Sequence, residues 1–219
     1  MVRTKLKNIA LLAVAAAVAL PIYSQEVNIS KDDPLEIESS TWNVNNRTKA
    51  VTYTGEVKVR HAGNIMKAEK VTILPDSDMI TAEKHIEFTE KSGTRTTGEF
   101  AEYLKSSKQL IMKENATLVS MDKEKVRTNV RADVMELYGN ENRAVARGNV
   151  DISRLDMKVK CGTALLDDRK DSVVLEDNPV VTKLDDIFKG KKLTIYFGKR
   201  LLVAEGDVTA KFYVKGAGE

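Results

Sequence analysis

Few side chains in this sequence have types and positions suited to catalysis or metal binding. The chain has one cysteine, Cys161, and two histidines, His61 and His85. A nucleophilic cysteine requires a neighbouring base, and a metal site requires several ligands at short spacing. No histidine lies near Cys161, and neither histidine forms a metal-binding spacing with acidic neighbours. We therefore expect no catalytic residue, no metal site and no cofactor, and a packing role for Cys161.

Three carboxylates recur at regular spacing, at Glu69, Glu99 and Asp133. Two carboxylates can act as general acid and base only when both reach the same substrate. On alternate strands of a sheet, equivalent positions would lie roughly 10 Å apart. The series is also broken at the equivalent positions Ser40, Gly162 and Lys191. A turn or bulge role is the better interpretation, because the strip of clustered catalytic side chains that a carbohydrate-acting β-helix enzyme needs is missing.

Each of these carboxylates follows a small residue that marks a repeat. The small residues are Ser39, Ala68, Gly98, Ala132, Cys161 and Gly190. They are separated by 29, 30, 34, 29 and 29 residues. Sixteen residues after each of them comes a glycine or a polar residue, at Gly55, Lys84, Glu114, Gly148, Asp177 and Gly206. A repeat of this length predicts an array of similar structural units.

Apolar and polar residues alternate on both sides of these positions, as in "VTYTGEVKV" from Val51 to Val59. Alternation with period two predicts strands with one dry and one wet face. Between the two strands of each unit stands a segment of turn-forming residues, such as "PDSD" or "GNEN". We predict an all-β protein of about six repeated β-hairpins of about 30 residues, with about twelve strands and a bulge or bend at each small residue.

The amino terminus has the order of an export signal. Arg3, Lys5 and Lys7 precede an uncharged run of 15 residues from Ile9 to Tyr23. This run is shorter than the about 20 residues that cross a bilayer. We predict that residues 1–24 are a cleaved signal peptide and that residues 25–219 form a single exported domain. The signal contains three of the 35 basic residues and none of the 32 acidic ones. The remaining chain is therefore neutral, and we expect no nucleic-acid partner.

The segments "MKAEKVTI", "VRADVMEL" and "ARGNVDI" resemble the OstA-like repeats of the LptA family, which has relatives in LptC and in the amino-terminal domain of LptD. The resemblance covers about Ile37 to Phe212, with departures at Lys84 and Glu114, which replace a glycine, and at Pro179. It implies an elongated, twisted β-jellyroll, or β-taco, that lies in the periplasm and is not an enzyme.

The same resemblance implies a ligand and partners. The dry interior would carry the acyl chains of lipopolysaccharide. An inner-membrane LptC-like component and an outer-membrane LptD-like translocon would be partners, and copies of the chain could join as a head-to-tail homo-oligomer.

A dry face that continues through such a stack would form the lipid-binding groove. Large residues on this face alternate with many alanines, which we expect to leave spare width for a ligand. The candidate groove residues are Val44, Val51, Tyr53, Val57, Val59, Val71, Ile73, Ile80, Ile86, Phe88, Tyr103, Leu110, Met112, Leu118, Met135, Leu137, Val150, Ile152, Leu175, Ile195 and Val208.

The first and last strands of an open sheet present unpaired backbone groups that invite another strand. The candidate edge-pairing residues are Val27, Ile29, Val203, Val208 and Phe212. Two alternatives stay open. One is a membrane-tethered LptC-like component of the same system, which the short apolar run disfavours. The other is a structural β-repeat protein, such as a filament or adhesin, that uses its edge strands without a lipid ligand.

Overall fold

The computed structural model describes residues 36–213, apart from 62, 75–76, 105, 122–124, 139–140, 142 and 168. Every regular element among these residues is a strand, and sixteen strands form one antiparallel sheet. The prediction of an all-β fold is confirmed. The predicted signal peptide (residues 1–24) and the edge candidates Val27 and Ile29 lie outside the described residues. In the described part of the chain, no helix could span a membrane.

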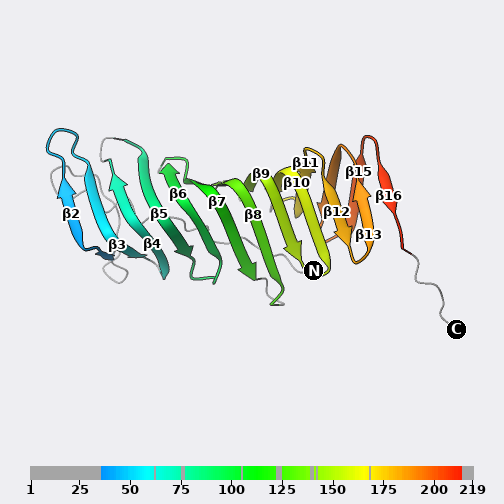
Figure 1. The fold of residues 1–219 in the computed structure, drawn as a ribbon, viewed down its shortest axis with the longest axis horizontal. Coiled ribbons are helices and arrows are strands. Elements are labelled where there is room, and N and C mark those ends of the chain that lie inside the picture. The colour runs from blue at the N-terminus through cyan, green and yellow to red at the C-terminus, as the bar shows by residue number, and fades with distance from the viewer. Residues whose placement is uncertain are drawn as a thin grey trace.

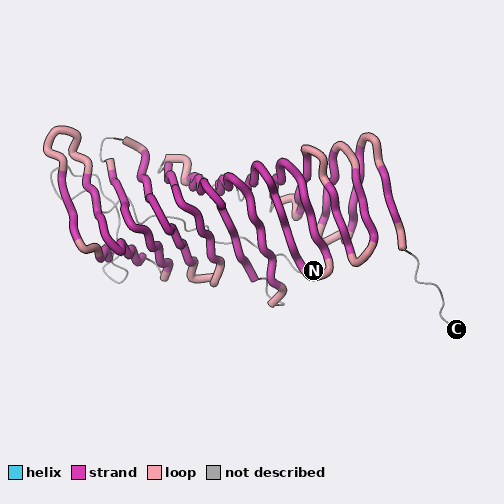
Figure 2. The backbone as a smooth tube through the Cα atoms, viewed as in Figure 1, coloured by secondary structure: helices cyan, strands magenta, loops and turns pink. Residues whose placement is uncertain are grey.

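The strands follow one another along the long axis of the molecule (Figure 1). They are β1 (Glu36–Glu38), β2 (Thr41–Val44), β3 (Val51–His61), β4 (Asn64–Ile73), β5 (Met79–Thr89), β6 (Arg95–Leu104), β7 (Gln109–Met121), β8 (Arg127–Tyr138), β9 (Arg143–Arg154), β10 (Met157–Asp167), β11 (Ser172–Glu176), β12 (Val180–Lys183), β13 (Asp186–Lys189), β14 (Lys192–Tyr196), β15 (Leu201–Glu205) and β16 (Thr209–Lys211). Loops occur mainly where the chain reverses between strands (Figure 2).

The number of strands exceeds the predicted twelve because four of the predicted strands are divided in two. The divided pairs are β1 and β2, β11 and β12, β13 and β14, and β15 and β16. The breaks fall at the small residue or at the position sixteen residues after it, where the longer strands show a register shift, for example between Thr54 and Val57. At one break Pro179 has no backbone N–H to donate, so the strand cannot continue through it.

A backbone corner occupies the same place in every unit. Residues 16 and 17 positions after each small residue all have positive φ: Gly55 83°, Glu56 46°, Lys84 65°, His85 51°, Glu114 61°, Asn115 60°, Gly148 74°, Asn149 47°, Asp177 63°, Asn178 59°, Gly206 70° and Asp207 50°. Two successive left-handed residues turn the strand and shift its register. The sequence predicted a bulge or bend at the small residue, and the register does shift there, as between Lys67 and Lys70. The left-handed residues lie on the facing strand, at a position that the prediction did not include.

The corners divide the sheet into two facing walls. The division is clearest at β10, whose residues 163–167 pair with β11 and whose residues 157–160 pair with β12. The first wall contains β2, β11, β14, β15 and residues 51–54, 70–73, 79–83, 100–104, 109–113, 134–138, 143–147 and 163–167. The second wall contains β1, β12, β13, β16 and residues 57–61, 64–67, 86–89, 95–97, 116–121, 127–131, 150–154 and 157–161.

The core lies between the walls, and its smallest residues lie beside the corners. Ala68, Ala82, Ala101, Ala116 and Ala146 are all buried, and each occupies a repeat position within a few residues of a corner or of the small residue. At Gly98, an added Cβ would lie 2.6 Å from Cγ of Met112. Small side chains let the two walls approach each other where they converge. The expectation that alanines leave spare width was wrong, because they permit close packing.

Candidate functional site

The candidate site is the apolar interior between the two walls. Residues that alternate along each strand point inward and form one hydrophobic cluster that extends through the repeats. Among the predicted groove residues, the structure buries Val57, Val59, Val71, Ile73, Ile80, Ile86, Phe88, Tyr103, Leu110, Met112, Met135, Leu137, Val150, Leu175 and Ile195. It half-buries Val51, Tyr53, Leu118 and Ile152.

Two predicted groove residues lie at the ends of the sheet and are exposed. Val44 is 42% exposed and Val208 is 54% exposed. Val44 ends β2, an edge strand of the first wall, and Val208 lies in the last repeat, between β15 and β16. Their repeat positions match buried residues in other units, but no further unit covers them. Their exposure follows from their place at the ends of the sheet, and their assignment to the dry face stays a prediction.

The structure adds interior residues that the sequence reasoning missed. They stand two residues before the small residue of each unit, on the second wall: Ile37, Met66, Val130, Val159 and Phe188, with Thr96 at the equivalent place in the third unit. Val159 is 1% exposed and Thr96 is 2% exposed. The sequence contained a signal for them: each lies two residues before a small residue, so both side chains are on the same face of the strand.

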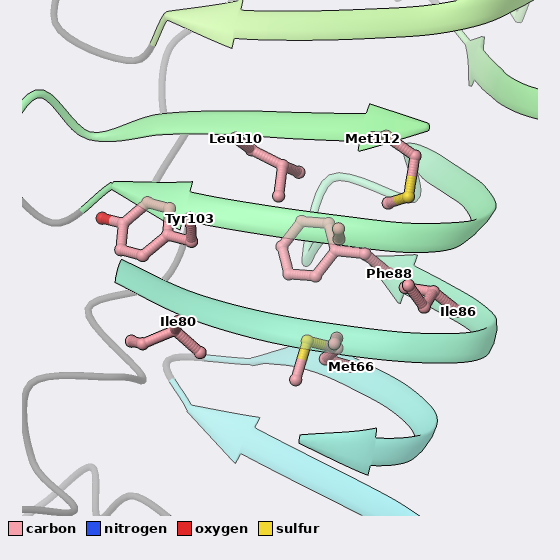
Figure 3. Close-up of a pocket in the computed structure, with 9 residues that line it drawn as sticks. Met66, Ile80, Ile86, Phe88, Tyr103, Leu110 and Met112 are labelled. Atoms are coloured by element: carbon pink, nitrogen blue, oxygen red, sulfur yellow. The ribbon is translucent and has the colours of Figure 1, made fainter. Parts of the chain in front are cut away.

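The middle of the interior contains a small cavity, of about 20 Å³, lined by residues of both walls (Figure 3). Met66, Ile86 and Phe88 come from the second wall and lie opposite Tyr103 and Leu110 of the first (Figure 3). A space of this size holds about one water molecule. Side chains of both walls belong to one apolar cluster and fill most of the space between the walls here.

The titratable groups in or near the interior are suited to packing. Burial raises the pKa of Tyr53, and burial, followed by the charge of Asp78, raises that of Tyr103. Burial also raises the pKa of the Cys161 thiol to about 11. A thiol with so high a pKa is protonated at neutral pH and is a poor nucleophile. Cys161 thus fills its small-residue position as a neutral side chain.

Polar residues line the outer side of the corners. The ring Nδ1 of His85 lies 2.9 Å from Oε1 of Glu69, and its backbone N–H donates to Oε2 of Glu99 at 3.0 Å. Further along, Nδ2 of Asn149 donates to Oδ2 of Asp133 at 2.9 Å. The recurring carboxylates hold the left-handed corner residues in place. Among the described residues, no group of His, Cys, Asp or Glu side chains has the arrangement of a metal site.

The outer faces of the walls carry cross-strand ion pairs. Lys70 and Glu83 are 2.8 Å apart, as are Lys113 and Glu102, and their side chains are partly exposed. Pairs of this kind contribute little to stability, each up to about 1 kcal/mol. They keep the outer faces polar, so the apolar residues of each strand are directed to the interior.

Among the described residues, no strand pairs with the outer side of the sheet at either end. At the amino-terminal end the edge strands are β1 on the second wall and β2 on the first, and at the other end they are β16 and β15. Of the predicted edge residues, Val203 lies in β15, while Val208 and Phe212 flank β16. The Phe212 ring packs edge-on against Phe188 with centroids 5.7 Å apart.

These features define a class of protein: an elongated, twisted β-jellyroll whose folded sheet encloses an apolar interior and ends in unpaired strands. The model of the family described as "LptA/(LptD N-terminal domain) LPS transport protein" matches residues 36–200. The chain belongs to this family, and the predicted resemblance is confirmed. No curated protein matches the chain.

One solved structure similar to this chain is described as that of LptH from Pseudomonas aeruginosa, "the LptA homologous periplasmic component of the conserved lipopolysaccharide transport device". The two sequences are 11% identical over 84% of this chain and 97% of that one, with a TM-score of 0.25.

Proposed function

We propose that this chain is a non-enzymatic periplasmic carrier that binds lipopolysaccharide acyl chains between its two walls and takes part in lipopolysaccharide transport from the inner to the outer membrane. The observation that carries the proposal is the apolar interior, which continues from repeat to repeat in a chain of this family. A protein that only used its edge strands would not need such an interior to be continuous.

The energetic demand of the task matches this interior. An acyl chain in water costs about 0.8 kcal/mol per CH₂, so roughly 10 kcal/mol for a chain of ordinary length. Val57, Ile86 and Val150 occupy one repeat position and are each at most 2% exposed. A chain lying along these positions would exchange water for apolar contacts at every repeat.

An acyl chain needs more room than the cavity of about 20 Å³ between the walls, so binding would require the walls to separate. The strands pass from one wall to the other only at the corners and at the small residues on the facing strands, and elsewhere the walls meet through side-chain packing. Rotation at the paired left-handed residues, such as Glu114 and Asn115, would part the walls as a hinge. Packing against the acyl chains would then replace the packing of one wall against the other.

The open ends supply the route to partners. An LptC-like component at the inner membrane, an LptD-like translocon at the outer membrane or a second copy of this chain could each add strands to β1 and β2 or to β15 and β16. Such pairing would extend both walls across the joint and align the apolar interiors of successive domains.

Photo-crosslinking tests the interior as the lipid site. A benzophenone amino acid at Ile86, Phe88 or Val150 should capture lipopolysaccharide, since these side chains lie between the walls. Matched probes at Glu87 and Asp151, which neighbour these residues on the opposite face, should not. Equal capture on both faces would contradict the proposal.

A further inference from the structure

The second wall ends in a row of hairpin turns, and one repeat position on this row is apolar in four successive units. The position stands 23 residues after the small residue. It is occupied by Met121, Leu155, Leu184 and Tyr213, which we call the apolar margin. These side chains are 64%, 75%, 73% and 50% exposed. The turns after β7, β9 and β12 follow one another along the lower side of the view in Figure 1.

The two leucines occupy a backbone conformation that disfavours them. Leu155 has φ 51° and Leu184 has φ 53°, each in a two-residue turn where glycine or asparagine is the usual choice. Burial does not explain leucine at these places, because both side chains project into solvent. A strained and exposed apolar residue that recurs at the repeat spacing indicates a contact made outside the folded chain.

Other exposed apolar residues have a simpler explanation. Trp42, Val208 and Phe212 lie at the ends of the sheet, where no further strand covers them. Leu155 and Leu184 lie within the row of turns, with neighbouring units on both sides. The backbone N–H of Leu184 donates to the carbonyl oxygen of Asp156 at 3.0 Å, so adjacent turns are held at a fixed spacing.

Each member of the apolar margin has a basic residue beside it. Arg127 is the cross-strand partner of Met121, and Arg154 and Lys183 directly precede the two leucines. Nζ of Lys211 lies 4.9 Å from the centroid of the Tyr213 ring. Carboxylates are also present: Asp156 and Asp185 follow the leucines, and Oδ1 of Asp186 accepts from the backbone N–H of Tyr213 at 3.1 Å, so the margin is mixed in charge. The basic residues nevertheless accompany every apolar side chain of the row.

The spacing of the apolar margin indicates whether it fits a protein partner or a lipid bilayer. Equivalent positions on alternate strands are roughly 10 Å apart, and charged residues stand between them. A protein partner usually requires a continuous patch with few charges at its centre. The interfacial region of a bilayer accepts separate apolar side chains and pairs its phosphates with nearby basic groups. We propose that the apolar margin docks this protein on the surface of an anionic lipid bilayer.

Vesicle sedimentation tests this proposal with the full-length chain and vesicles of phosphatidylglycerol and phosphatidylethanolamine that contain no lipopolysaccharide. The result is therefore independent of the proposed carrier function. The double variant Leu155→Asn, Leu184→Asn should bind the vesicles at least roughly tenfold more weakly. Asparagine tolerates positive φ better than leucine does, so the melting temperature of the double variant should be equal to or higher than that of the wild type. Every variant has the same amino terminus, so any contribution from that segment cancels.

Two control variants define the site and its chemistry. Leu201→Asn, at an exposed leucine on the first wall, should leave vesicle binding unchanged. Lys183→Gln should weaken binding roughly fivefold on anionic vesicles and have no effect on phosphatidylcholine vesicles. The proposal is overturned if the wild-type chain does not bind, if the double variant binds as well as the wild type, or if Leu201→Asn is equally weakened. It is also overturned if the double variant changes self-association in sedimentation velocity while vesicle binding is retained, since the margin would then contact a second copy.

Discussion

At the residue scale, the fold depends on side chains that fit the corners. Three corners have glycine at the first left-handed position, and the other three have Lys84, Glu114 or Asp177. At Gly148 the close approach of the paired strand β8 requires glycine, because an added Cβ would lie 2.9 Å from Cβ of Asp133. At the Asp177 corner the glycine is instead on the facing strand, at Gly162, where an added Cβ would lie 2.5 Å from Cβ of Asp177. In both contacts, Gly148 with Asp133 and Gly162 with Asp177, only one of the two residues can carry a side chain.

Replacing two glycines by alanine separates backbone strain from this steric requirement. Gly93 has φ 87° with no atom within 4 Å of an added Cβ, so Gly93→Ala should lower the free energy of unfolding by about 1 kcal/mol. Gly148→Ala adds a contact with Asp133 to the same strain, and we expect a loss of about 2–3 kcal/mol. Urea unfolding measures both. Equal losses would mean that the corner yields and that the close contact is unimportant.

At the element scale, strands, turns and the bend could be predicted because each follows from local pattern. Alternation defines an inward face, and a change of parity requires a bulge. Burial at the ends could not be predicted in this way, since Val208 has the pattern of Ile86 but no following unit. The close contact of the walls was also missed, because the same alanines are compatible with a wide or a closed interior until the distance between the walls is known.

Edge pairing at the carboxyl end can be tested with proline in β15. The strand pairs on one side with β14 and is open on the other, and successive N–H groups of a strand point to opposite sides. Of Leu202→Pro and Val203→Pro, the variant that loses an outward N–H should stay folded and lose end-to-end association, whereas the other should be destabilised.

Leu202→Ala and Val203→Ala control for the loss of each side chain in this experiment. Light scattering measures association and circular dichroism measures folding. If both proline variants stay folded and associate as the wild type does, β15 is not the pairing edge. Val208 was predicted as an edge-pairing residue, but it lies between β15 and β16 and outside the strand pairing. We therefore expect Val208→Pro to weaken end-to-end association less than proline in β15 does.

At the scale of the whole molecule, the sheet is a stack in which each unit contacts its neighbours. Residues in the middle of the stack, such as Met112 and Ala116 of β7, are fully buried, while Trp42 near one end is 63% exposed and Phe212 near the other is 64% exposed. Stability therefore declines toward both ends. The end strands are consequently the part of the fold that gains most from a neighbouring domain, and the interior gains most from a ligand.

Hydrogen exchange can separate these two gains in one molecule. End-to-end association should slow exchange in β1, β2, β15 and β16 by at least about tenfold as the protein is concentrated, because their outer backbone groups become paired. Exchange in β5 to β8 should stay constant, since these strands are paired on both sides in the single chain. Lipopolysaccharide at low protein concentration should instead alter exchange at the corners, Glu114 and Asn115 among them, where separation of the walls changes the backbone. A concentration effect spread evenly over all strands would contradict pairing at the ends, because only general stabilisation would produce it.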